Sequence, residues 1–212
     1  YRIAKRLIKR GQDAWAITAQ DPFETGLLGY FLALSRKIPL QLQIHTDFLN
    51  PFFKNESFLN RFRVLIARWL LPRAASVRVV SERIRKSLSI FNLKSSTKIV
   101  VLPVFVDIER IRATPVSVNL HEKYSGFKYI ILMASRLTRE KNILLAFHAI
   151  REVVKYYPET LLLIVGNGPE GANLKFEISN LKLGSNIIFE PWTSNLISYY
   201  KTSDLFLLTS NY

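Results

Sequence analysis

Short apolar runs alternate along this chain with longer amphipathic stretches, and the alternation occurs twice. The first series has strand-length runs at 14–18, 40–45, 76–80 and 98–104, separated by stretches of helical period at 24–34, 57–71 and 82–91. The second series predicts strands at 129–134, 161–165, 186–189 and 205–209, and helices at 142–157, 170–181 and 194–202. This order, with β-branched residues in the strand runs, is typical of parallel sheets covered by helices. The sequence therefore predicts an α/β fold.

Residues 107–127 interrupt the alternation, because Pro, Ser, Asn and Gly stand there among scattered charges without a sustained period. We expect a linker here between two Rossmann-like domains at 1–106 and 128–212. Both domains are expected to be incomplete. The first begins without an opening strand and glycine-rich turn, and the final strand runs to the end of the chain at Tyr212.

The composition narrows the class of protein and of partner. Hydrophobic residues make up 49% and charged residues 22%, as in globular chains. The absence of cysteine and the wide spacing of His45, His121 and His148 predict no metal site. The charge is uneven: 18 basic minus 6 acidic residues give +12 in 1–106, and 12 minus 10 give +2 in 107–212. A basic surface attracts nucleic acid, anionic lipid or anionic substrates.

The loop at 134–142, Ala-Ser-Arg-Leu-Thr-Arg-Glu-Lys-Asn, joins an expected strand to an expected helix with Asn142 as its N-cap. Ligands of open α/β sheets bind beyond the carboxyl ends of the strands, and a helix N-terminus favours an anion. Arg136 would add a guanidinium fork and Lys141 a point charge, which suits a diphosphate. An ordinary loop with solvated charges is the alternative interpretation.

A second loop follows the apolar run at 161–165 and reads Gly166-Asn167-Gly168-Pro169. Glycines in such a loop permit positive φ and close approach of the backbone. The third glycine of the dinucleotide-binding fingerprint is missing. We therefore interpret Gly166 and Gly168 as structural residues of a loop that borders a cleft.

The order of these segments resembles the donor domain of retaining glycosyltransferases of family four, which have the GT-B fold. The motifs that carry the resemblance are Arg136-Leu-x-x-x-Lys-Asn, then Val165-Gly-x-Gly-Pro-Glu, then Ser203-Asp-Leu-Phe-Leu-Leu-x-Ser. The first half resembles the acceptor domain of this family at 43–48, 79–83 and 101–107. The resemblance implies a hexosyltransferase-like enzyme. It would move a sugar from a nucleotide-diphospho-sugar, such as a UDP- or GDP-sugar, to a glycan or lipid-linked acceptor with retention.

The resemblance also implies roles for individual residues. Arg136 and Lys141 would hold the donor diphosphate, in agreement with the local argument from charge. Glu190, Pro191 and Trp192 follow a predicted strand and would lie near the donor base. An aromatic residue of the protein core or of an interface is the alternative for Trp192.

His45 ends a predicted strand, and by resemblance it is a catalytic residue that contacts the transferred sugar or the acceptor. A structural histidine is the alternative. No metal or cofactor is implied beyond the nucleotide-sugar substrate. The family's acidic-glycine motif would come after Tyr212, so we expect the 212-residue chain alone to transfer no sugar.

The stretch at 57–71 has one apolar and one cationic side. The apolar side carries Phe58, Phe62, Leu65, Ile66 and Trp69, and the cationic residues are Arg61, Arg63 and Arg68, with Arg73 beyond. One interpretation is a helix that packs on its own sheet and exposes a basic face to solvent. The other is a peripheral contact with an anionic membrane surface.

Two other functions stay open at this point. The net charge would also suit a basic nucleic-acid-binding α/β protein, although no nucleic-acid motif accompanies the charge, and we expect no nucleic acid among the partners. The second of these open functions is that of an epimerase or phosphorylase with the GT-B fold. Our prediction is a cytoplasmic enzyme of cell-envelope or polysaccharide biosynthesis, with peripheral association at the inner face of the membrane.

Overall fold

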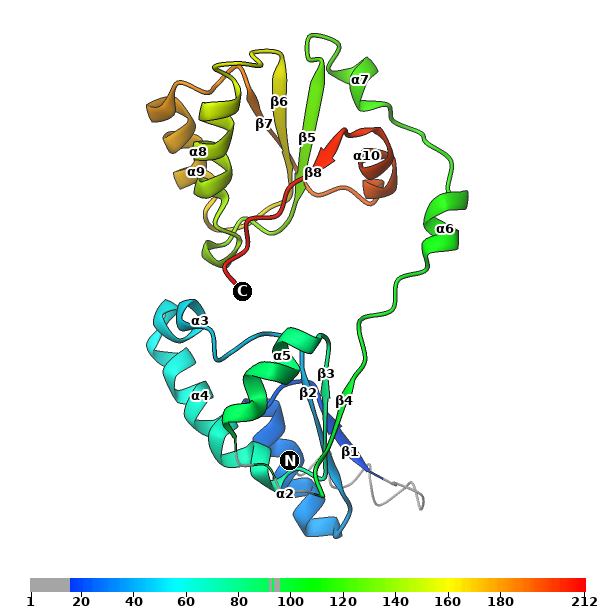
Figure 1. The fold of residues 1–212 in the computed structure, drawn as a ribbon, viewed down its shortest axis with the longest axis vertical. Helices are drawn as coiled ribbons and strands as arrows, with labels where there is room; N and C mark the ends of the chain where they lie inside the picture. Colours follow the sequence, from blue (N-terminus) through cyan, green and yellow to red (C-terminus); the bar gives the residue numbers. More distant parts are fainter. Residues whose placement is uncertain (1–15, 92, 94–95) are drawn as a thin grey trace. The chain divides into compact units, whose positions relative to one another are not determined.

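The structure is a computed structural model that describes residues 16–212 except 92, 94 and 95. The chain forms two compact units, one ending at Phe105 and the other running from Val106 to Asn211. Within the described residues, each unit contains one four-stranded parallel sheet (Figure 1), ordered β1-β2-β3-β4 in the first unit and β7-β6-β5-β8 in the second. The predicted α/β fold with two Rossmann-like halves is confirmed.

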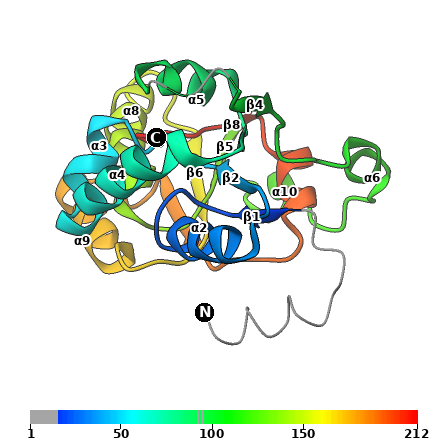
Figure 2. The same ribbon diagram turned by 90° about the horizontal axis from the view of Figure 1, so that it is seen from below.

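The first unit places its helices on one face of its sheet. Its strands are β1 (Ile17–Ala19), β2 (Leu40–Ile44), β3 (Ser76–Val79) and β4 (Lys98–Val101). Its helices are α2 (Glu24–Arg36), α3 (Pro51–Glu56), α4 (Phe58–Leu70), α5 (Glu82–Ser87) and the 3-10 helices η1 (Leu71–Arg73) and η2 (Leu88–Ile90). Helix α2 runs beside β1, and α4 packs on α2 (Figure 2). Leu40, Leu42 and Ile44 of β2 are buried in this core, whereas Gln41 and Gln43 are half-buried on the other face.

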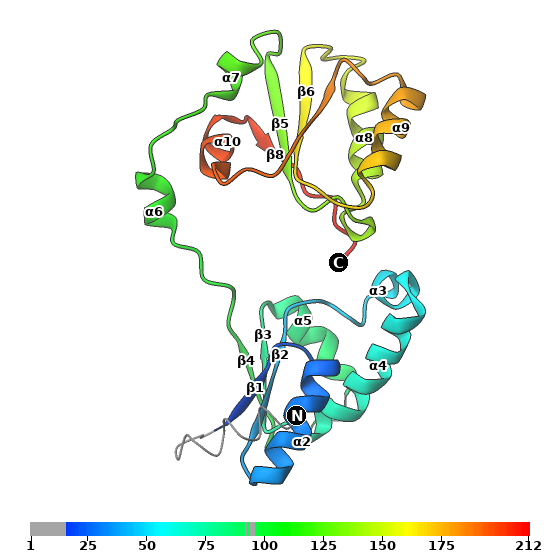
Figure 3. The ribbon, with the colours of Figure 1, turned by 180° about the vertical axis from the view of Figure 1, so that it is seen from behind.

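The second unit covers both faces of its sheet. Its strands are β5 (Tyr129–Ala134), β6 (Thr160–Val165), β7 (Ile187–Glu190) and β8 (Leu205–Phe206). Its helices are α6 (Ile108–Ala113), α7 (Leu120–Lys123), η3 (Arg139–Lys141), α8 (Ile143–Val153), α9 (Gly171–Leu181) and α10 (Leu196–Thr202). Helices α8 and α9 lie on one side of the sheet, and α7 and α10 lie on the other (Figure 3). All six residues of β6 are buried, which explains the continuous apolar run at 161–165.

The segment expected to lack a sustained period, 107–127, contains α6 and α7. Each is short, and a side chain caps its start: Asp107 Oδ1 accepts from the Arg110 N–H at 2.9 Å, and Asn119 Oδ1 accepts from the His121 N–H at 3.0 Å. Helix α6 has no buried residue, whereas Leu120 of α7 is fully buried in the core of the second unit. No helix within the described part of the chain combines the length and apolarity needed to cross a bilayer.

Helix α4 buries a different side from the one that its apolar residues indicated. Its buried residues are Asn60, Val64, Ala67 and Leu70. Phe58 is 72% exposed, Leu65 is 58% exposed and Trp69 is 41% exposed. The helix does pack on its own sheet and expose Arg61 and Arg68, as one interpretation expected. The contact is made by small and medium side chains, however, and the large apolar ones named in the sequence analysis are mostly exposed.

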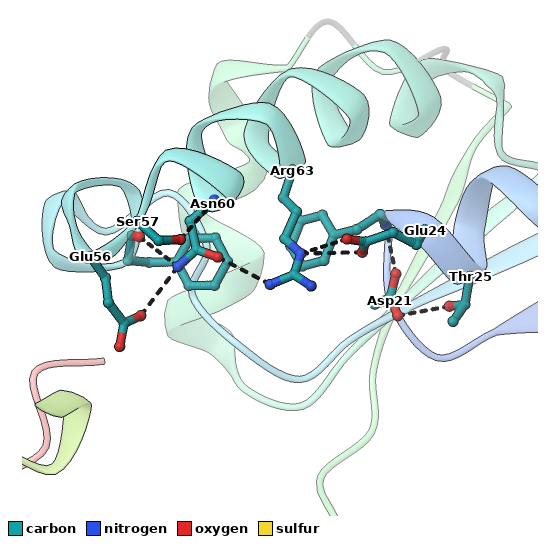
Figure 4. A network of polar contacts seen from close by, with 9 residues as sticks. Asp21, Glu24, Thr25, Glu56, Ser57, Asn60 and Arg63 are labelled. Atoms are coloured by element: carbon teal, nitrogen blue, oxygen red, sulfur yellow. Dashed lines mark hydrogen bonds and ion pairs between the residues drawn. The ribbon is translucent and has the colours of Figure 1, made fainter. Parts of the chain in front are cut away.

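Asn60 fixes this orientation of α4 through a network of polar contacts (Figure 4). Its backbone N–H donates to Ser57 Oγ at 3.1 Å, and its Nδ2 donates to the Phe53 carbonyl at 3.0 Å. Its Oδ1 accepts from Arg63 Nη1 at 3.1 Å, and Arg63 Nε donates to both oxygens of Glu24 on α2, at 2.9 and 3.2 Å. The amide thus links α3, α4 and, through the arginine, α2.

Replacing Asn60 by Ala should destabilise the chain by about 2 kcal/mol, because a buried carbonyl and a guanidinium each lose a partner. Equilibrium unfolding in guanidinium chloride measures this change in the free energy of unfolding. Asn55→Ala is the matched control, since Asn55 is an exposed residue of the neighbouring α3. Equal stability of the two variants would show that the network does not hold α4.

Candidate functional site

Three loops meet at the carboxyl edge of the second sheet, where β5, β6 and β7 end. The Ser135 N–H donates to the Val165 carbonyl at 3.1 Å, and the Leu137 N–H donates to the Asn167 carbonyl at 3.0 Å. The Gly166 N–H donates to the Glu190 carbonyl at 3.0 Å. Because parallel strands end on the same side, residues from three separate segments are brought together here.

Gly166 and Gly168 allow these loops to approach closely. Gly166 has φ of +149°, and a Cβ built on it would lie 2.0 Å from the Ser135 carbonyl oxygen. A Cβ on Gly168 would lie 2.3 Å from the Leu137 carbonyl oxygen. Both glycines therefore shape the loop through their missing side chains.

Two hollows open between the loops. One of about 380 Å³ is lined by Ala134, Ser135, Arg136, Val165, Gly166, Asn167, Trp192 and Leu196. Another of about 520 Å³ is lined by Leu137, Gly166, Asn167, Gly168, Gly171, Ala172, Lys175, Phe189, Glu190 and Pro191. Arg136, both glycines and residues 190–192 are thus gathered at one edge of the sheet, and Lys175 is a cation that the sequence analysis did not single out.

Arg136 is exposed at the rim of the smaller hollow, with Nη2 3.3 Å from Glu140 Oε1. Lys141 ends η3 in the same loop and is not among the residues that line the two hollows. Asn142 occupies the N-cap position of α8, as expected, but its side chain caps no N–H of the helix. Its backbone is left-handed, with φ of 47° and ψ of 48°, whereas a capping side chain is typically carried on extended backbone.

The segment after β8 holds this loop in place. Thr209 Oγ1 donates to the Lys141 carbonyl at 2.8 Å, and the Asn211 N–H donates to the Glu140 carbonyl at 2.8 Å. The Nδ2 of Asn142 donates to Asn211 Oδ1 at 3.1 Å. The backbone around Lys141 is therefore positioned by the segment that follows β8.

Three hydroxyl groups on these loops, those of Ser135, Thr138 and Ser210, are buried and have no hydrogen-bond partner within the described structure. A buried hydroxyl without a partner costs about 1–3 kcal/mol, which a hydrogen bond to a ligand would recover. Ser135 also lines the smaller hollow. The sequence contains no signal for these groups, because their lack of partners depends on packing.

Glu190 is held by three donors from other elements. Lys123 Nζ donates to Oε1 at 2.6 Å, Tyr199 OH donates to Oε2 at 2.5 Å, and Tyr124 OH also donates to Oε1. Burial of Glu190 disfavours its charged form, but the three hydrogen bonds outweigh burial and lower its pKa. The carboxylate thus joins α7, β7 and α10.

The same cluster shifts the pKa values of its donors. Burial and the hydrogen bond to Glu190 raise the pKa of Tyr124 to about 12. Burial alone would lower the pKa of Lys123, but hydrogen bonds to Glu190 and Tyr199 outweigh it and raise this pKa. At neutral pH the cluster therefore contains one carboxylate, one ammonium and two neutral phenols.

His45 belongs to the first unit, where it follows β2 with an exposed side chain. Its Nε2 lies 3.2 Å from Gln43 Oε1. The histidine is thus available to a ligand from the carboxyl end of the first sheet.

Two family models match the chain. The model described as Glycosyltransferase Family 4 matches residues 1–110, and the model described as Glycosyl transferases group 1 matches residues 121–212. The first match spans more than half of the 212 residues.

Individual glycosyltransferases are also similar to this chain in sequence or in fold. The chain is 28% identical over 205 residues to the alpha-monoglucosyldiacylglycerol synthase of Streptococcus pneumoniae, covering 92% of this chain and 46% of that protein. Among solved structures, HepE of Anabaena in complex with UDP has a TM-score of 0.72 at 18% identity, over 99% of this chain and 57% of that one. Sucrose-phosphate synthase of Thermosynechococcus elongatus has a TM-score of 0.79 at 17% identity, over 99% and 54%. These likenesses show the fold of GT-B glycosyltransferases, and the chain spans about half the length of its relatives.

Replacing Glu190 by Gln should lower the free energy of unfolding at pH 7 by about 2 kcal/mol and flatten its acid dependence. The folded-state pKa of Glu190 is lowered from 4.5, so its stabilisation is present above that pH and is lost as the pH falls through the folded-state value. Denaturation of the variant from pH 7 to about pH 3 measures both effects. Glu159→Gln, at an exposed position of the same unit, should keep the wild-type profile. A wild-type profile for the Glu190 variant would contradict the proposed charge state.

Proposed function

This chain belongs to Glycosyltransferase Family 4, and we propose that the whole protein moves a hexose from a nucleotide-diphospho-sugar to a glycan or lipid-linked acceptor with retention of configuration. Its relative from S. pneumoniae is named for a glucosylated diacylglycerol, which supports a lipid acceptor. A neighbour by fold binds UDP, which supports a uridine donor. A role in cell-envelope or polysaccharide biosynthesis follows from this substrate class.

One observation carries the proposal: Arg136 and Trp192 border the same hollow. A guanidinium fork suits a diphosphate, and an indole offers an apolar face to a nucleobase. We propose that Arg136, with Lys141 from the same loop, holds the diphosphate and stabilises its charge as the sugar departs. These cations supply the needed positive charge, so the proposal invokes no metal or cofactor.

The loop after β7 is proposed to contact the donor base through Pro191 and Trp192, both of which are exposed. Glu190, whose carboxylate already accepts three hydrogen bonds, is assigned to holding this loop rather than to touching the base. His45 keeps its proposed role at the sugar or acceptor.

The nucleic-acid-binding alternative is not favoured, because the family matches span both units. A GT-B-fold epimerase or phosphorylase differs from a transferase in its product. Product analysis with the whole enzyme separates these reactions.

Arg136→Ala should weaken binding of UDP by about 30-fold, the equivalent of about 2 kcal/mol for a lost charge-assisted contact. Isothermal titration with UDP, GDP and UMP measures the loss and the preference for base and diphosphate. Arg139→Ala is the matched control, since Arg139 lies in the same loop and pairs with Glu170 at 3.3 Å. If both variants bind UDP like the wild type, Arg136 does not hold the diphosphate.

We also propose that the first unit contacts an anionic membrane surface. Its outer helical face is formed by exposed apolar residues of α2 and α4, namely Leu28, Phe31, Leu34, Phe58, Leu59, Phe62, Leu65 and Trp69. The two helices contact each other there through Tyr30 and Trp69, whose ring centroids lie 5.1 Å apart. An exposed apolar surface of this extent is typical of an interaction site.

Cations favour a membrane as the partner of this face. Arg61 and Arg68 are exposed on α4, and the guanidinium of Arg73 lies 4.2 Å from the centroid of the Trp69 ring. Interleaved arginine and aromatic side chains suit anionic headgroups above an apolar boundary. The enzyme would then act in the cytoplasm at the inner face of the membrane, where a lipid-linked acceptor lies.

The double variant Phe58→Ser/Leu65→Ser should bind phosphatidylglycerol-rich vesicles at least about tenfold more weakly than the wild type, because two apolar side chains no longer enter the bilayer. Vesicle co-sedimentation at low salt measures this, with phosphatidylcholine vesicles as the uncharged reference. The control Tyr156→Ser/Phe176→Ser alters two exposed aromatics of the second unit. Equal binding of wild type and outer-face variant, or no preference for anionic vesicles, contradicts the membrane assignment. Light scattering without vesicles tests self-association through the same face.

A further inference from the structure

The exposed face of the first sheet carries a ladder of polar side chains that no step of the proposed function has used. Gln43 of β2 and Arg78 of β3 are register partners in adjacent parallel strands. Arg78 Nη1 donates to Gln43 Oε1 at 2.9 Å. Arg78 Nε and Nη2 both donate to the Leu102 carbonyl, at 3.3 and 3.2 Å. The guanidinium is thus held in place by Gln43 of β2 and by the backbone of the residue that follows β4.

The position of Arg78 decides which way the Gln43 amide points. A guanidinium has only donors, so the amide must present its oxygen to Arg78. The other end of the amide agrees with this orientation, because Gln43 Nε2 donates to Thr18 Oγ1 on β1 at 3.0 Å. A flipped amide would place its NH₂ group against the guanidinium.

The fixed amide oxygen in turn decides which nitrogen of His45 carries the proton. Gln43 Oε1 lies 3.2 Å from His45 Nε2, and an amide oxygen only accepts. We infer that Arg78 and Gln43 are positioning residues that hold the neutral His45 ring as its Nε2–H tautomer. The lone pair is then on Nδ1, and the hydrogen bond that the described residues give this side chain is through Nε2.

This assignment gives His45 a defined chemical capacity. A neutral ring with its lone pair on Nδ1 accepts a hydrogen bond from a hydroxyl group. In the transfer reaction that hydroxyl would belong to the sugar or to the acceptor, and this last step rests on the proposed function. The tautomer itself does not, because it follows from contacts within the first unit.

The test is a long-range ¹H–¹⁵N NMR correlation on the full 212-residue chain with ¹⁵N-labelled histidine, at a pH where the ring is neutral. His45→Gln assigns the signal among the three histidines. The wild-type ring should be wholly in the Nε2–H form. Gln43→Met should relax it to the mixture of tautomers seen in solvent-exposed histidine, and Arg78→Met should do so in part by freeing the amide to turn.

Gln41 supplies the matched control, since it lies two residues away on the same strand face and contacts Thr18 and Ser76 instead. Gln41→Met should leave the tautomer unchanged. A wild-type Nδ1–H ring, or the same tautomer population in Gln43→Met as in the wild type, overturns the inference. The measurement needs no substrate, so failure of the proposed glycosyl transfer would be seen separately.

Discussion

Complete burial of β6 is the constraint on which the second unit depends. A parallel strand buried on both faces needs helices on both faces, and α8 and α9 cover one while α7 and α10 cover the other. Each crossover returns the chain to the same edge of the sheet, so the loops after β5, β6 and β7 end side by side. The hollow between Arg136 and Trp192 exists because three strands finish there together.

The first unit also contains a parallel sheet, but one face of this sheet carries polar side chains. Its strands β2 and β3 alternate between buried apolar and half-buried polar residues, and the described helices lie on one face. The polar face is free to form side-chain contacts across strands, which is how Gln43 comes between Arg78 and His45. On the far side of the helices, large apolar residues face outward because α4 packs through smaller ones. The unit thus has a chemically distinct surface on each side.

Sequence reasoning located the elements that are long enough to show a period, and it located the loops at their ends. Strand β5 matches its expected bounds, and α4 differs by one residue at each end. Helices α3, α6 and α7 were missed because four to six residues are fewer than two turns, so their capping side chains rather than a period define them.

The candidate site likewise contains residues whose place could be predicted from the sequence and residues whose conformation could not. The place of Arg136 and residues 190–192 followed from the strand ends that precede them. The conformation of Asn142 could not be predicted, because its side-chain partner, Asn211, is 69 residues away.

The Glu190 cluster joins Lys123 to a carboxylate 67 residues later. During synthesis the ammonium group therefore leaves the ribosome long before its acceptor exists, whereas β5, α8 and β6 are consecutive and can assemble first. Closure of this cluster needs Glu190 of β7 and Tyr199 of α10, so a chain halted before Glu190 would present the unpaired edge of β6 to chaperones and proteases.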